Sequence, residues 1–172
     1  NSLMTKLSTV TLRYLQRQVE AGAQVVQLFD SWVGTLGRYD YRTFVMPHSA
    51  AIFAGLRDAG VPSIHFGTGT STFLDLMKEA GGAVIGVDWR VDLDEVWKRL
   101  GDTTILQGNL DPVTMLGSRQ TVSQAVRRVL EQVKGRPHIF NLGHGILPET
   151  PPENVETAIQ QVRSWPEIGK QI

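Results

Sequence analysis

The feature that most constrains the fold of this sequence is a regular alternation of helix-period stretches with short apolar runs. The runs carry apolar residues on both faces, which is typical of parallel strands covered on both sides. They recur roughly every 20 to 40 residues, a spacing that suits βα units. The predicted strands are Val25–Phe29, Pro62–Phe66, Ala83–Val87, Thr104–Gln107 and His138–Leu142. The sequence therefore predicts a single α/β domain over residues 1–172 with five parallel strands. Periodicity and composition leave two architectures open, an open doubly wound sheet and part of a closed barrel.

Helical periodicity and helix-start signals define the segments between the strands. The first helix is predicted over about Thr5–Gly22, and its expected inner face is Leu7, Val10, Tyr14, Leu15 and Val19. Asp92 with Glu95, and Thr121 with Gln124, have the spacing of a capping box, in which each side chain accepts from an N–H at the helix start. We therefore expect helices to begin at both places.

Composition excludes several classes of function. Seventeen basic and seventeen acidic residues give a formal net charge of zero, so a broad electrostatic footprint for nucleic acid is absent. The chain has no cysteine, which excludes disulfides, thiolate zinc sites and cysteine nucleophiles and is consistent with a cytoplasmic protein. No apolar run approaches the roughly 18 residues that a membrane span needs.

Polar residues and glycines gather directly after all five predicted strands. In both architectures ligands bind at the C-terminal ends of parallel strands, so these segments form the predicted active face. The segments are Asp30–Trp32, Gly67–Thr70, Asp88–Arg90, Gly108–Pro112 and Gly143–Gly145.

Two of these segments contain the main candidate site residues. His144 lies between two glycines, so a ligand could approach its ring and use it as an acid, a base or a hydrogen-bond donor to a carboxylate. The alternative is a histidine that caps local backbone groups. Ser31 follows the first strand, with Phe29 two residues earlier on the same side. Its hydroxyl could bind a substrate carboxylate or close a turn, but the surrounding residues lack the nucleophile-elbow motif.

The remaining strand-end residues carry weaker signals. Gly67–Thr70 could cradle an anion, but it lacks the lysine of a phosphate-binding loop, and we favour a simple lip loop here. Asp88 is either a site carboxylate or a structural group, and Asp111 before Pro112 is expected to fix a turn. No residues show metal-ligand spacing, and no nucleotide fingerprint is present.

Four segments in order carry a resemblance to a known family. They are Glu20–Ser31 (EAGAQVVQLFDS), Val84–Trp89 (VIGVDW), Leu106–Pro112 (LQGNLDP) and Asn141–Pro148 (NLGHGILP). Together they resemble the C-terminal half of uroporphyrinogen decarboxylases. This resemblance implies a (β/α)8 TIM barrel, of which the chain supplies about the last five β/α units. It further implies a cytoplasmic, homodimeric carboxy-lyase of heme biosynthesis that uses no cofactor and no metal. Such an enzyme converts uroporphyrinogen to coproporphyrinogen.

The resemblance also assigns site residues. Ser31 and His144 match the family's substrate-binding serine and histidine, and Phe29 matches an apolar wall residue of the cleft. The family's aspartate, arginine-rich motif and tyrosine belong to the N-terminal half, and neither Tyr39 nor Tyr41 matches that tyrosine. We therefore expect no activity without that half.

Two other functions remain as alternatives. One is a corrinoid or thiol methyltransferase of the same superfamily, against which the absence of cysteine argues because those enzymes bind zinc through histidine and cysteine. The other is a non-catalytic tetrapyrrole-binding fragment.

Overall fold

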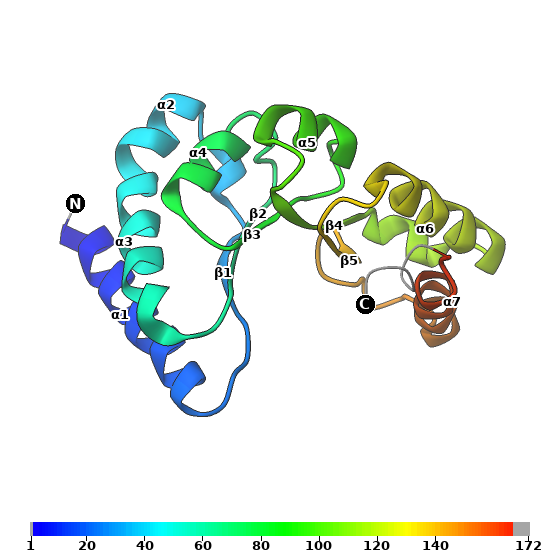
Figure 1. The fold of residues 1–172 in the computed structure, drawn as a ribbon, viewed down its shortest axis with the longest axis horizontal. Helices are drawn as coiled ribbons and strands as arrows, with labels where there is room; N and C mark the ends of the chain where they lie inside the picture. The colour runs from blue at the N-terminus through cyan, green and yellow to red at the C-terminus, as the bar shows by residue number, and fades with distance from the viewer. Residues whose placement is uncertain (1, 167–172) are drawn as a thin grey trace. The chain divides into compact units, whose positions relative to one another are not determined.

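The computed structural model describes residues 2–166, and its strands follow one another in the order β1-β2-β3-β4-β5 (Figure 1). The strand pairs β1·β2, β2·β3 and β4·β5 are parallel, with helices between successive strands. The predicted α/β class with five parallel strands is confirmed, and it matches a partial (β/α)8 barrel. The chain divides into two compact units, unit 1 at Asn1–Gly86 and unit 2 at Val87–Ile172.

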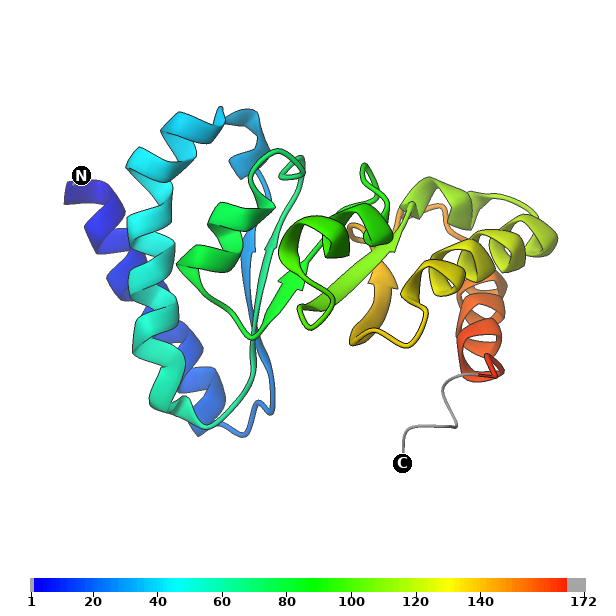
Figure 2. The same cartoon turned by 45° about the horizontal axis from the view of Figure 1, so that its top comes forward.

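Unit 1 holds three strands with helices packed against one face. Its elements are α1 (Ser2–Glu20), β1 (Val26–Asp30), η1 (Val33–Thr35), α2 (Arg38–Asp40), η2 (Tyr41–Val45), α3 (Met46–Leu56), η3 (Arg57–Ala59), β2 (Ser63–Gly67), α4 (Leu74–Ala80) and β3 (Val84–Gly86). The helices α1 and α3 lie side by side, as Figures 1 and 2 both show. Burial of apolar side chains between these helices and β1 forms the local core.

The predicted inner face of α1 is confirmed for Leu15 and Val19 and wrong for Leu7, Val10 and Tyr14. Leu15 is buried against β1 and α3, and Leu12 and Val19 pack beside it. Val10 and Tyr14, which were expected to be buried, are each 65% exposed, and Leu7 is 52% exposed. The helix carries two apolar stripes at helical spacing, and periodicity alone does not say which of them meets the sheet.

Unit 2 begins on the continuation of β3 and contains the last two strands. Its elements are α5 (Leu93–Leu100), β4 (Ile105–Leu110), η4 (Pro112–Leu116), α6 (Arg119–Val133), β5 (His138–Leu142) and α7 (Pro152–Arg163). Val87 N–H donates to Gln107 O at 2.8 Å, which aligns the chain after β3 with β4. The helices α6 and α7 pack together (Figure 1), and the buried Asn154 amide donates to the carbonyls of Met115 and Gly117.

Neither predicted capping box forms. Asp92 is the N-cap of α5, but its side chain makes no capping bond and instead accepts from Gln132 Nε2 at 3.4 Å. The helix α6 begins at Arg119, and Ser118 Oγ accepts from Thr121 N–H at 3.1 Å. Ser118 follows Gly117, so the chain can enter the helix earlier than the Thr121 pattern indicates.

None of the helices within residues 2–166 combines the length and the apolar character that crossing a membrane requires.

Candidate active site

Two predicted site residues of unit 1 lie where β1 ends. Phe29 is 67% exposed, and its ring meets that of Phe66 on β2 edge-on, with 5.9 Å between ring centroids. Ser31 is the first residue after the strand and is half-buried. Because alternate residues of a strand share a face, Phe29 and Ser31 lie on the side opposite to Asp30. The pair therefore forms an apolar surface with a hydroxyl beside it.

The loops after β1 and β2 pack directly on each other. The Thr68 hydroxyl donates to the carbonyl of Ser31, and the Thr70 hydroxyl donates to Gly67 O at 3.3 Å. A Cβ on Gly34 would lie only 2.0 Å from Thr68 O, so this approach requires glycine. The Gly67–Thr70 segment thus positions Ser31, and no observation supports its use as an anion cradle.

Asp30 lies on the side of β1 that faces the helices. The sequence analysis did not single it out as a separate site residue. Burial raises its pKa from 3.8 to about 6. Tyr41 is fully buried and stacks on Phe73 with 4.6 Å between ring centroids. Burial, and secondly the charge of Asp30, raise the pKa of Tyr41 as well. These shifts depend on tertiary burial, which the sequence does not display.

Two other histidines, His65 and His138, have structural roles. His65 is fully buried, and its Nδ1 lies 3.1 Å from Met77 O and 3.2 Å from Gly81 O. Burial lowers its pKa to about 4, although these two backbone contacts oppose the shift. His138 Nε2 lies 2.7 Å from Gly108 O, and burial lowers the pKa of His138 also. Both positions inside strands fit packing rather than chemistry.

Asp30 and His65 should give unit 1 opposite pH dependences. The folded chain holds the Asp30 proton up to about pH 6, whereas the unfolded chain releases it near 3.8, so Asp30 lowers stability as pH rises through this window. The unfolded chain protonates His65 near 6.5 and the folded chain only near 4, so His65 lowers stability as pH falls through that window. Asp30→Asn should therefore gain stability over wild type as pH rises from 4 to 6, by up to about 2 kcal/mol.

The measurement is urea unfolding of wild type, Asp30→Asn and His65→Gln at several pH values. His65→Gln should show the reverse trend, with its stability relative to wild type increasing as pH falls from 6.5 towards 4. A free-energy difference between Asp30→Asn and wild type that stays constant across this range would contradict the raised pKa of Asp30.

In unit 2, the segments at the C-terminal ends of β3, β4 and β5 contact one another. Asp88 follows β3 and is 1% exposed. The Asn109 amide on β4 donates to Asp88 O at 2.9 Å and to Val91 O at 2.6 Å, which holds the turn after β3. Gly143 N–H after β5 donates to Leu110 O at 2.7 Å. The three predicted strand-end segments of unit 2 are therefore brought together.

His144 stands at this junction beside an aromatic and cationic stack. Its ring meets the Trp89 ring edge-on, with 6.4 Å between centroids, and the His144 side chain is exposed. Arg90 Cζ lies 3.9 Å from the centroid of the Trp89 ring, and Arg90 Nη1 lies 2.5 Å from Asp88 Oδ2. A Cβ on Gly143 would lie 2.5 Å from Trp89 N, so glycine at 143 permits this approach. Within residues 2–166 the His144 ring makes no hydrogen bond to a backbone group, so it does not act as a backbone cap and remains available to a ligand.

Asp111 has the structural role that its position predicts. Its Oδ1 accepts from Val113 N–H at 2.9 Å and so caps the turn η4. By contrast, Trp89 and Arg90 were not singled out from the sequence. The available signal was their position directly after a strand, but the stack on Trp89 depends on the fold.

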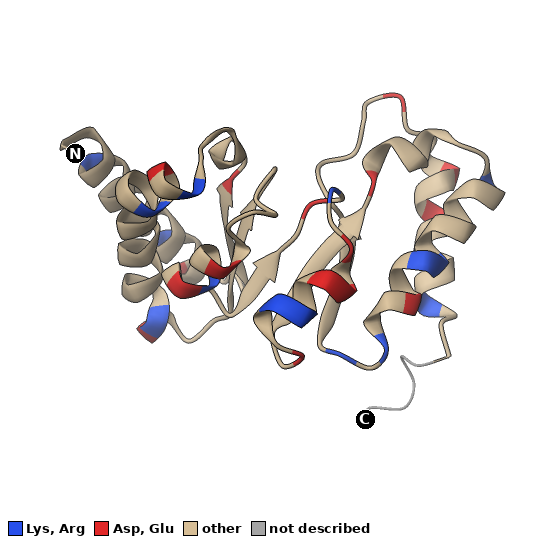
Figure 3. Cartoon of the chain, turned by 90° about the horizontal axis from the view of Figure 1, so that it is seen from above, with Lys and Arg blue, Asp and Glu red and all other residues tan. Residues whose placement is uncertain are grey.

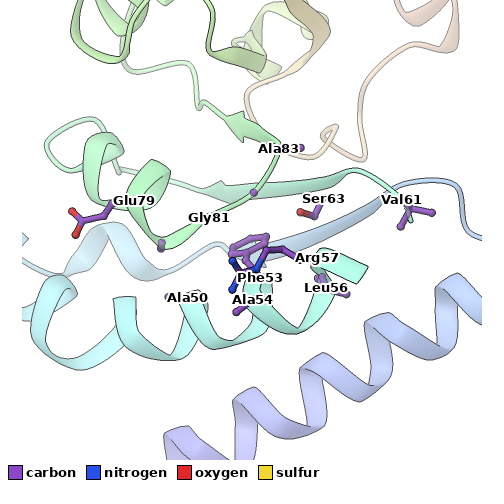
Figure 4. Close-up of a pocket in the computed structure, with 12 residues that line it drawn as sticks. Ala50, Phe53, Ala54, Leu56, Arg57, Val61, Ser63, Glu79, Gly81 and Ala83 are labelled. Atoms are coloured by element: carbon purple, nitrogen blue, oxygen red, sulfur yellow. The ribbon is translucent and has the colours of Figure 1, made fainter. Parts of the chain in front are cut away.

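A pocket of about 600 Å³ in unit 1 lies away from these strand ends (Figure 4). Its lining includes Ser63 at the start of β2, Ala83 just before β3, and Phe53 on α3. It therefore opens at the N-terminal ends of the strands, opposite to Ser31. Parallel α/β folds place their chemistry at the other end, so we do not assign this pocket as the active site.

Comparisons with known proteins identify relatives of the whole chain. Residues 1–165 match the family model described as Uroporphyrinogen decarboxylase (URO-D). Proteins named uroporphyrinogen decarboxylase from Sorangium cellulosum and Salinispora tropica are 51% and 53% identical over 172 and 154 residues. The matches cover 99% and 89% of this chain but 49% and 42% of those proteins, so the chain spans about half the length of these curated relatives.

A solved structure supports the fold assignment. A methyltransferase from Methanosarcina mazei superposes with a TM-score of 0.78, covering 90% of this chain and 46% of that one. The sequence identity is 20%, so this likeness concerns the fold alone.

Proposed function

Because the chain belongs to the uroporphyrinogen decarboxylase family, we propose that it forms part of an enzyme that converts uroporphyrinogen to coproporphyrinogen. The reaction removes carbon dioxide from four acetate side chains. The observation that carries the proposal is the family match over residues 1–165, with about half the residues identical in named decarboxylases.

The chemistry fits polar contacts and requires no bound cofactor. Protonation of a pyrrole carbon makes the ring electron-poor, and the ring then accepts the electron pair left by departing carbon dioxide. The protein has to position the substrate and stabilise charge. In unit 1 the Ser31 hydroxyl binds a substrate carboxylate and Phe29 supplies an apolar wall. In unit 2 the exposed His144 donates a hydrogen bond to the substrate.

We further propose that both units are consecutive parts of one barrel domain, which a preceding segment or a separate chain completes. Two features of unit 1 support this. Among the described strands β1 has a neighbour on one side only. The exposed stripe of α1, formed by Leu3, Leu7, Val10 and Tyr14, offers an apolar surface for a further helix. The complete enzyme would be a cytoplasmic homodimer, as the family resemblance implies.

A porphyrin titration tests the proposed contacts. Uroporphyrin, the stable oxidised form of the substrate, is titrated into the chain and binding is followed by quenching of its fluorescence. Ser31→Ala and His144→Ala should each weaken binding about tenfold, since each removes a hydrogen bond to an ionised carboxylate. Ser123→Ala, a similar small change on α6, is the control and should leave the affinity unchanged. Equal affinities for all four proteins would refute the assignment of these residues.

A further inference from the structure

The Asp88–Trp89–Arg90 turn of unit 2 is a built cationic site that the proposed function leaves unused. Arg90 lies over the Trp89 ring, with Cζ 3.9 Å from its centroid. This contact orients the planar guanidinium and leaves most of its N–H donors available for hydrogen bonds. The same ring meets His144 on the β5 loop at 6.4 Å. The Trp89 indole therefore contacts the Arg90 guanidinium and also His144, the residue proposed to bind substrate.

The carboxylate of Asp88 holds this turn in place through contacts with Arg90. Asp88 is 1% exposed, its Oδ2 lies 2.5 Å from Arg90 Nη1, and its Oδ1 accepts from Arg90 N–H at 3.2 Å. A buried carboxylate that holds both the backbone and the head of one arginine limits where that head can go. A surface arginine without such a partner would sample many rotamers.

The guanidinium nevertheless keeps binding capacity. Its side chain remains 50% exposed, and its only hydrogen bond to a side chain within residues 2–166 runs from Nη1 to Asp88. Nε and Nη2 make no hydrogen bond to any residue that the structure describes, so they can donate in parallel to one carboxylate. Figure 3 shows acidic and basic residues interspersed within each unit.

We propose that Arg90 is a further carboxylate-binding residue, which holds one carboxylate of a polycarboxylated tetrapyrrole while His144 holds another carboxylate of the same ligand. This inference rests on the proposed function for the identity of the ligand. The two side chains border one indole ring, and a tetrapyrrole carries its carboxylates around a wider perimeter. Arg90 thereby favours ligands with more carboxylates over those with fewer.

The test compares uroporphyrin, with eight carboxylates, and coproporphyrin, with four. Arg90→Gln should weaken uroporphyrin binding about tenfold and reduce the preference for uroporphyrin over coproporphyrin. Arg90→Lys keeps the charge but loses the planar fork of donors, so its affinity for uroporphyrin should lie between those of wild type and Arg90→Gln. Arg127→Gln, which removes one exposed charge from α6 in the same unit, is the matched control and should change the affinity less than twofold.

Each outcome decides between the two proposals. If His144→Ala loses affinity while Arg90→Gln matches Arg127→Gln, the role of Arg90 is overturned and the proposed function stands. If wild type binds no porphyrin, the proposed function fails for this chain. The Arg90 contact is then judged with benzenehexacarboxylate, which should shift the Trp89 indole N–H resonance in wild type and not in Arg90→Gln. Equal shifts in both proteins would overturn it.

Discussion

Replacing Trp97 by alanine should lower the free energy of unfolding of unit 2 by about 3–5 kcal/mol, the usual cost of removing a tryptophan from a core. Trp97 on α5 is fully buried, and its Nε1–H donates to Thr104 O at 2.9 Å. Its ring meets that of His138 edge-on at 6.1 Å, and Arg136 Cζ lies 5.2 Å from its centroid. Truncation removes all of these contacts, leaves a cavity and frees a buried carbonyl.

Urea unfolding followed by far-ultraviolet circular dichroism measures this loss without depending on tryptophan emission. Trp32→Ala is the matched control, because the same substitution is made at a side chain that is 85% exposed. It should change the free energy by less than about 0.5 kcal/mol. Similar losses for the two variants would show that Trp97 is not buried against Thr104 and His138.

The strands and their ends could be predicted from the sequence because buried parallel strands have a signal of their own. The apolar runs give all five strands, and the first is displaced by only one residue, from Val25–Phe29 to Val26–Asp30. Polar residues after an apolar run identify the strand ends, since packing does not require them there. The structural role of Asp111 followed from the same local chemistry.

Features that depend on tertiary contacts could not be predicted. The side of α1 that packs on β1 is decided by the neighbouring α3, and the sequence offers two similar stripes. The edge contact of Trp89 with His144 joins residues from different loops, and the contact of Arg90 with the Trp89 ring depends on the conformation of the turn that holds both residues. The raised pKa of Asp30 arises from its burial in the folded chain, which the amino-acid sequence does not show.

Uroporphyrinogen should stay unconverted with residues 1–172 alone and be decarboxylated once a complementary segment is present. The resemblance places the aspartate that stabilises the reacting ring outside this chain. Removing one preorganised group of this kind costs about 10²–10³ in rate. The free side of β1 and the exposed stripe of α1 also need a partner before the proposed barrel can close. The complement is the segment preceding the matched region in the relative from Sorangium cellulosum.

The most direct measurement is therefore coproporphyrinogen formation by the chain alone, by the complement alone, and by the two mixed. The account predicts product in the mixture only, at a rate at least about 10²-fold above either part. A mixture containing the chain with both Ser31→Ala and His144→Ala is the control and should be much slower. Product formation by residues 1–172 alone at the rate of the mixture, or an inactive mixture whose two parts form a stable complex, would contradict the account.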